Sequence, residues 1–181
     1  MIHELEDGGR ASAQENVFPR VLAEVNRFAE LAPDLESLQN FIVEILPKWL
    51  PRYNWTGFYM LDPNDPDTLV LGPFRGAPTE HVRIPVSQGI CGAAVAQNGT
   101  VIVDDVSSDP RYLACSLETR SEIVVPVRVD GAIVGEIDID SHEFAAFSSE
   151  DRAFLEGCAV AVGNFIERTQ AGTMRTMGES S

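Results

Sequence analysis

Residues 121–140 limit the possible folds of this chain more than any other stretch. They read SEIVVPVRV-DG-AIVGEIDID, two runs rich in β-branched residues around an Asp-Gly pair, which predicts an antiparallel β-hairpin. Side chains alternate along a strand, so the second run has two unlike faces. One face carries Ile133, Ile137 and Ile139, and the other carries Val134, Glu136, Asp138 and Asp140.

The length of the turn decides which residue lies opposite Glu122. A two-residue loop at Asp130-Gly131 would place Glu122 opposite Ile139, on the apolar face, where an ionised carboxylate is costly. A three-residue loop over residues 129–131, with a left-handed Gly131 that forms a bulge, would place Glu122 opposite Asp138. The second register satisfies both faces, so we predict it.

In that register Glu122, Asp138 and Asp140 share one face of the sheet. Like charges this close resist full ionisation, and the group retains a proton. Such a cluster could hold an ammonium group and also supply a proton to a reacting oxygen. The alternative is a solvent-exposed acidic face in an acidic protein, and strand alternation alone leaves both interpretations open.

Apolar spacing and turn residues predict the other elements. Helices are expected from Val17, from Leu35 until Pro47, over Gly89–Gln97, and from a capping box at Ser148 and Asp151; strands are expected over Trp55–Leu61, Thr68–Phe74, His81–Val86 and Thr100–Val106. This order indicates an α+β fold with a central antiparallel sheet and the N- and C-terminal helices packed on one face. We expect a tail over residues 1–15, one domain over 16–168 and a polar C-terminal tail over 169–181.

Composition excludes several classes of partner. The 181 residues carry a formal net charge of −15, with 28 acidic and 13 basic residues. This charge repels phosphate backbones and anionic lipid, so we expect neither nucleic acid nor membrane as partner. The N-terminus has no apolar signal segment, and the three cysteines form no disulfide pattern. We therefore expect a cytoplasmic protein.

The three cysteines differ in their surroundings. Cys158 lies on the apolar stripe of the last helix, which indicates a packing residue. Cys91 lies between glycines near a helix start, where the helix dipole would favour a thiolate, although small buried cysteines are also common there. Cys115 lies in a polar loop between strands, and such loops often carry chemistry.

Metal and cofactor motifs are missing from the sequence. His3, His81 and His142 have no ligand spacing such as i, i+4 on a helix. There is also no glycine-rich phosphate loop and no G-x-S-x-G elbow. We expect no metal and no cofactor.

Six short stretches, taken in order, resemble the free methionine-(R)-sulfoxide reductases, a GAF-domain family. They are NWTGFY at 54–59, LGPF at 71–74, GICG at 89–92, AC at 114–115, SEIVVP at 121–126 and IDID at 137–140. The resemblance covers roughly residues 17 to 168. Each motif alone is weak, but six in this order and spacing are specific.

The resemblance implies a role for each matching residue. Cys115 matches the cysteine that attacks the sulfoxide sulfur, and Cys91 matches a partner that resolves the product as a disulfide. The carboxylates Glu122, Asp138 and Asp140 match those that bind and protonate the substrate. Trp55 matches the aromatic wall beside the substrate methyl group. The implied partners are free methionine sulfoxide and a thioredoxin-like reductant.

The chain departs from the family at two positions. A third family cysteine is absent from residues 76–83, where His81 is the residue in its place, so recycling must use Cys91 or an external thiol. Ser116 stands where an acidic residue often follows the catalytic cysteine.

The alternative function is a non-catalytic GAF module that senses a small amino acid or amine. A cyclic-nucleotide sensor is disfavoured because the acidic face repels phosphate. A homodimer through the first helices is compatible with the sequence.

Overall fold

The structure, a computed structural model, describes residues 17–113 and 116–178, with side chains through residue 172. Its elements are α2 (Val17–Leu31), α3 (Leu35–Trp49), β1 (Trp55–Asp62), β2 (Asp65–Arg75), β3 (Arg83–Pro85), α4 (Gly89–Gln97), β4 (Val101–Val103), the 3₁₀ turn η1 (Val106–Ser108), β5 (Ser121–Val129), β6 (Ala132–Ser141) and α5 (Ser149–Gly178).

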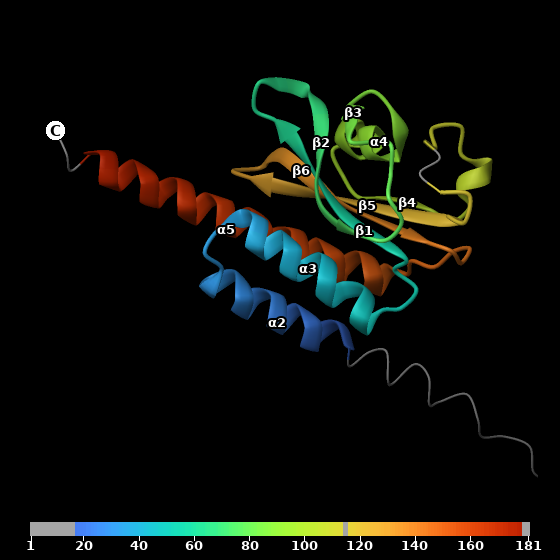
Figure 1. Cartoon of the computed structure of the whole chain (residues 1–181), viewed down its shortest axis with the longest axis horizontal. Helices are drawn as coiled ribbons and strands as arrows, with labels where there is room; N and C mark the ends of the chain where they lie inside the picture. The colour runs from blue at the N-terminus through green and yellow to red at the C-terminus, as the bar shows by residue number, and fades with distance from the viewer. Residues whose placement is uncertain (1–16, 114–115, 179–181) are drawn as a thin grey trace, which may run out of the picture.

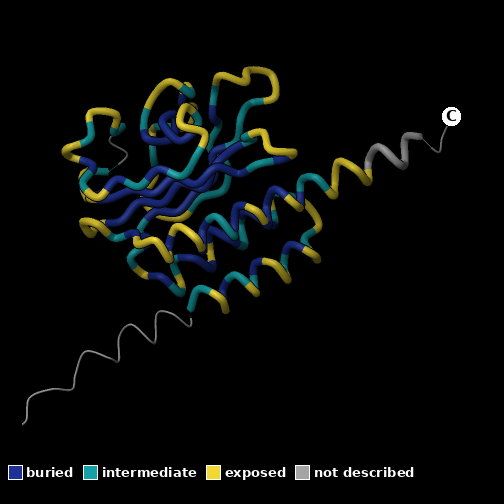
Figure 2. Tube along the Cα trace, turned by 180° about the vertical axis from the view of Figure 1, so that it is seen from behind, coloured by how far each residue is buried: buried dark blue, intermediate teal, exposed yellow. Residues whose placement is uncertain are grey.

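The six strands form one antiparallel sheet in the order β3-β2-β1-β6-β5-β4. Helices α3 and α5 lie against one face of this sheet with α2 packed on them, and α4 lies on the other face (Figure 1). The α+β class and the packing of both terminal helices on one face are therefore confirmed. The strands in the middle of the sheet are buried, whereas the exposed residues gather in turns and on outer helix surfaces (Figure 2).

The helices begin and pack where local chemistry favours it. Asp34 caps α3 and accepts a hydrogen bond from the Ser37 amide at 2.8 Å. The capping box of α5 is present, because the Ser148 amide donates to Asp151 at 2.9 Å and the Asp151 amide donates to the Ser148 hydroxyl at 3.2 Å. The core that these helices form with the sheet includes Val25, Leu46, Phe58, Ile137, Cys158 and Val162.

The opposite face has its own, smaller core under α4. This helix has the predicted bounds, and Asn98 ends it in the left-handed conformation with φ 51°. Gly92 allows α4 to lie close to the preceding segment, since a Cβ there would be 2.7 Å from the Val86 carbonyl oxygen. The apolar residues of this core include Trp55, Tyr59, Leu69, Ile90, Cys91 and Val124.

The predicted register of the β5–β6 hairpin is wrong. Asp130 and Gly131, with φ of 49° and 81°, form a two-residue turn, and Val129 pairs with Ala132. The extra residue is Val134, which forms a bulge because Val127 pairs with Gly135 and Arg128 with Ile133. Glu122 therefore lies opposite Asp140, not Asp138.

This bulge still leaves the acids on one face. A simple two-residue hairpin would pair Glu122 with Ile139; the predicted loop shifts this pairing by one residue to Asp138, and the bulge shifts it by one residue the other way, to Asp140. Either shift leaves Glu122, Asp138 and Asp140 on the same face of the sheet. Before the bulge the faces are exchanged, and Val134, which we placed on the acidic face, packs against the helix-covered core.

Several predicted element ends also differ. Helix α3 continues through Pro47 to Trp49, because a proline in the last turn removes only one backbone hydrogen bond. The β1–β2 turn is shorter than predicted, since Asp62 already pairs with Asp65. Helix α5 continues through Gly178, past residue 169, where we expected a polar tail, and its last turns extend beyond the sheet (Figure 1). Among the described residues, no helix combines the length and apolar character of a membrane span.

Candidate active site

Four carboxyl groups are buried on the sheet face that α4 covers. Glu122 comes from β5, and Glu136, Asp138 and Asp140 come from alternate positions of β6. Their residues are between 0% and 5% exposed. The interpretation of a solvent-exposed acidic face is therefore wrong, and the acids form a buried acidic floor between the sheet and α4.

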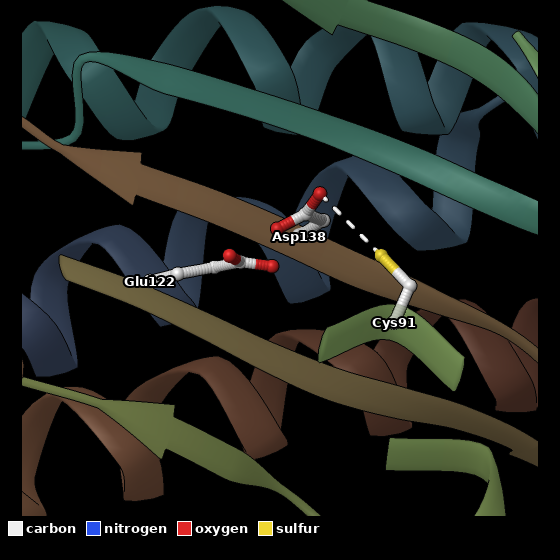
Figure 3. Close-up of side chains that lie close together, drawn as sticks. All are labelled: Cys91, Glu122 and Asp138. Atoms are coloured by element: carbon white, nitrogen blue, oxygen red, sulfur yellow. Dashed lines mark hydrogen bonds between the residues drawn. The ribbon is translucent and has the colours of Figure 1, made fainter. Parts of the chain in front are cut away.

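Cys91 completes this cluster from the first turns of α4. Its Sγ donates a hydrogen bond to Asp138 Oδ2 at 3.6 Å. The sulfur and one carboxyl oxygen each of Glu122 and Asp138 lie within 4.8 Å of one another, and the three side chains point toward one another (Figure 3). Groups that converge in this way can surround a small cation such as an ammonium group.

Burial controls the protonation of the four acids. It is the main reason why the pKa values of Glu122, Glu136 and Asp140 are well above their ordinary range, and it raises that of Asp138 to about 7. The neighbouring charge of Asp138 raises the pKa of the other three carboxyls further. The cluster can therefore retain protons near neutral pH without a metal ion, which suits both proton donation and cation binding.

The thiol of Cys91 is held in its neutral form. Burial raises its pKa well above the ordinary value, and the charges of Asp138, Glu136 and Glu122 raise it further. Of the two possibilities that the sequence left open for Cys91, the structure shows the buried cysteine, since desolvation and three acids outweigh the favourable dipole of a nine-residue helix. In this state Cys91 is a protonated thiol, which becomes a good nucleophile only when its proton is removed.

These shifts predict an unusual pH dependence of stability. Between the ordinary pKa of Asp138 at 3.8 and its folded value of about 7, the folded protein binds more protons than the unfolded chain. The free energy of unfolding should therefore fall as the pH rises from about 5 to about 7, by up to about 1.4 kcal/mol per pH unit for each such acid. Urea unfolding at several pH values measures this slope, and Asp138→Asn should reduce it. Stability that rises over this window would contradict the protonation that we assign.

Trp55 forms a wall beside the acids. It pairs across the sheet with Asp140 and is 7% exposed. Its indole stacks on Phe74 at 5.6 Å between ring centroids and donates a hydrogen bond to the Ala77 carbonyl at 3.1 Å. Gly57 makes room for the ring, because a Cβ there would be 2.3 Å from an indole carbon. The indole is therefore fixed as a rigid apolar surface next to the carboxyl cluster.

Cys115, the predicted nucleophile, lies outside the described residues. On one side of it, the Leu113 side chain packs at Gly89, where α4 begins, two residues before Cys91. Across residues 114–115, the Tyr112 hydroxyl donates to the Ser116 carbonyl at 3.3 Å. Leu113 thus contacts the beginning of the helix that carries Cys91.

Two residues of the site did not appear among the predicted site residues. Thr119, which is 4% exposed, lies close enough to Asp140 for its hydroxyl to lower the pKa of that carboxyl, and so joins the end of the loop to the acids. Glu136 adds a fourth carboxyl to the floor. Strand alternation already placed Glu136 on the acidic face, so a signal was available for it, whereas nothing in the sequence distinguishes Thr119.

Comparison with known proteins tests the resemblance. A model of the GAF domain family matches residues 32–167. The free methionine-R-sulfoxide reductase of Escherichia coli (strain K12) is 46% identical over 111 residues, which are 61% of this chain and 65% of that protein. The reductase of the same name from Saccharomyces cerevisiae is 43% identical over 107 residues, 59% of each chain. The chain thus spans just under two thirds of the length of these relatives.

A solved structure agrees over nearly the whole chain. The X-ray structure of the free methionine-R-sulfoxide reductase from Neisseria meningitidis, in complex with its substrate, superposes with a TM-score of 0.83 at 31% identity. The match covers 95% of this chain and 98% of that one. The chain therefore belongs to the GAF domain family and groups there with the free methionine-R-sulfoxide reductases.

Proposed function

We propose that this protein reduces free L-methionine-(R)-sulfoxide to methionine by cysteine chemistry. The observation that carries the proposal is the set of buried, converging acids beside Cys91 and under the Trp55 indole. A free amino acid has an ammonium group, and a buried acidic floor is the surface that would bind it. The similarity to named reductases, one of which was solved with its substrate, supports the same reaction.

The residues suggest how the reaction proceeds. The Cys115 thiolate attacks the sulfoxide sulfur while a protonated acid, Glu122, donates to the sulfoxide oxygen. Methionine leaves, and the oxygen remains on Cys115 as a sulfenic acid. Asp138 and Asp140 hold the ammonium group, and Trp55 contacts the methyl group. Cys91 then attacks the sulfenic acid to give a disulfide and water, and a thioredoxin-like dithiol reduces the disulfide.

A turnover assay tests this proposal. Purified protein with dithiothreitol should form methionine from the R epimer of free methionine sulfoxide and leave the S epimer unchanged, as chiral chromatography of the products would show. A peptide with an internal methionine sulfoxide is the matched control and should react far more slowly, because its blocked amine cannot become an ammonium group.

The alternative function, a sensor of small amines, gives a different result in the same assay. Saturable binding of methionine sulfoxide without methionine formation would favour the sensor and overturn the reductase. Since the cycle requires reduced cysteines, we place it in the cytoplasm. The homodimer stays a prediction.

A further inference from the structure

Glu136 has no role in the reaction described so far, yet it is the most deeply buried acid of the site. Its residue is 0% exposed, and its carboxyl oxygens form no hydrogen bond of normal geometry with the described residues, although the Cys91 thiol lies close enough to lower the Glu136 pKa as a hydrogen-bond donor does. A carboxyl group buried without partners costs stability, typically a few kcal/mol. The family resemblance assigns functions to Glu122, Asp138 and Asp140 but none to this residue.

Several titratable groups face Glu136, and Glu122 on β5 is one of them, because the charge of Glu136 raises its pKa. On β6 these include Asp138, and from α4 the Cys91 thiol faces it closely enough for the Glu136 charge to raise the thiol pKa. Its cross-strand partner on β1 is Tyr59, whose hydroxyl donates to the His81 carbonyl at 2.7 Å. On β5 its partner is Pro126, which carries no charge. Glu136 and Asp138 therefore flank the Cys91 thiol.

The two acids beside Cys91, Asp138 and Glu136, differ in whether they are available to accept the proton of this thiol. Asp138 accepts the Cys91 hydrogen bond, and under the proposed function it also faces the substrate together with Glu122 and Asp140. Glu136 lies one strand repeat further from the loop end of the sheet, where Thr119 contacts Asp140. The proposed reaction assigns Glu136 no contact with the substrate, and Glu136 lies beside the thiol.

We propose that Glu136 is the base that removes the proton of Cys91 when this thiol resolves the oxidised enzyme. This inference rests on the proposed function, which supplies the Cys115 sulfenic acid. The thiol proton moves to the Glu136 carboxylate, the sulfur–sulfur bond forms and the Cys115 sulfur–oxygen bond breaks. Glu136 then gives this proton to the departing hydroxide, so that the step releases water and returns Glu136 to its carboxylate form.

The burial of Glu136 suits this task. A neutral thiol in an acidic pocket needs a base stronger than an exposed carboxylate. Burial raises the pKa of Glu136 well above its ordinary value, which makes its carboxylate such a base. Because the position of the third family cysteine holds His81, Cys91 is the remaining cysteine of the family pattern that can resolve Cys115.

Single-turnover kinetics tests the role of Glu136. Reduced wild type, Glu136→Gln and Glu136→Asp would each be mixed with free methionine-(R)-sulfoxide without reductant and quenched over time. Methionine, the trapped Cys115 sulfenic acid and the Cys91–Cys115 disulfide would be measured by mass spectrometry. In Glu136→Gln we expect disulfide formation, measured against the methionine burst of the same variant, to be slower by about 10²-fold, with a long-lived sulfenic acid. The rate of disulfide formation in Glu136→Asp should lie between those of wild type and Glu136→Gln.

The pH dependence adds a readout that a purely structural role would not change. The wild-type rate of disulfide formation should rise as Glu136 ionises, and the Glu136→Gln rate should rise only at the higher pH where the thiol itself ionises. If Glu136→Gln does not fold, slower disulfide formation in Glu136→Asp carries the same prediction.

Three results would overturn the inference, and they differ from one another. Disulfide formation at the wild-type rate in the variants would exclude Glu136 as the base. A wild-type protein that releases methionine but forms no Cys91 disulfide would show that an external thiol resolves Cys115. A wild-type protein without any methionine burst would overturn the proposed function itself, and this inference with it.

Discussion

Cys115→Ser is expected to abolish the reduction of free methionine-(R)-sulfoxide, a loss of at least about 10³-fold in kcat. A serine hydroxyl is a far weaker nucleophile than a thiolate and cannot store the sulfoxide oxygen as a sulfenic acid. Substrate affinity should remain, because the acids and Trp55 that would bind methionine sulfoxide come from the sheet and not from this loop. The measurements are steady-state turnover and calorimetric binding on the same preparation.

Two further cysteine variants separate the roles of the thiols. Cys158→Ala is the matched control and should keep its turnover, because Cys158 is buried on the far side of the sheet among the residues of the helix-covered core. Cys91→Ser should release one methionine per chain and then accumulate the sulfenic acid. Normal turnover in Cys115→Ser would remove the nucleophile that we assign, and a burst in that variant would point to Cys91 instead.

The sequence predicted the fold through patterns that have few physical solutions. The alternation of the acidic strand required one buried apolar face, and the capping box and apolar stripe fixed the beginning of α5. The hairpin register was wrong because an added residue in the loop and an added residue in the strand satisfy alternation equally well. Only the backbone shows that the added residue is Val134.

The chemistry of the site was less predictable than its residues. Strand alternation placed Glu122, Asp138 and Asp140 together but left open whether they face water. Their burial depends on α4, which arrives from a distant part of the sequence and brings Cys91 to Asp138. The same packing decides between the two possibilities that the sequence left open for Cys91, since desolvation depends on tertiary contacts that no local pattern encodes.

Glu122→Gln is expected to lower kcat by about 10²- to 10⁴-fold and to raise stability at neutral pH. Glutamine keeps the shape of the side chain but cannot donate a proton to the sulfoxide oxygen. It also removes a buried acid whose pKa is well above the ordinary value, mainly because of desolvation and then the charges of Asp138 and Asp140. Near neutral pH the folded protein must keep that acid protonated at a cost, and the amide does not incur this cost. Glu36→Gln, on the exposed surface of α3, is the control: it should leave kcat unchanged and should not raise stability, since it removes a favourable charge from the first turn of the helix.

The opposite signs of these two effects are what make Glu122→Gln informative. A variant that was merely misfolded would lose turnover and stability together, whereas a lost proton donor in a relieved acidic cluster loses kcat and gains stability. The partition between kcat and KM then identifies what Glu122 does. If kcat is kept while KM rises, Glu122 binds the ammonium group in the ground state and a different acid, Asp138 or Asp140, protonates the oxygen. If kcat falls with little change in KM, its interaction forms in the transition state, as expected for the proton donor.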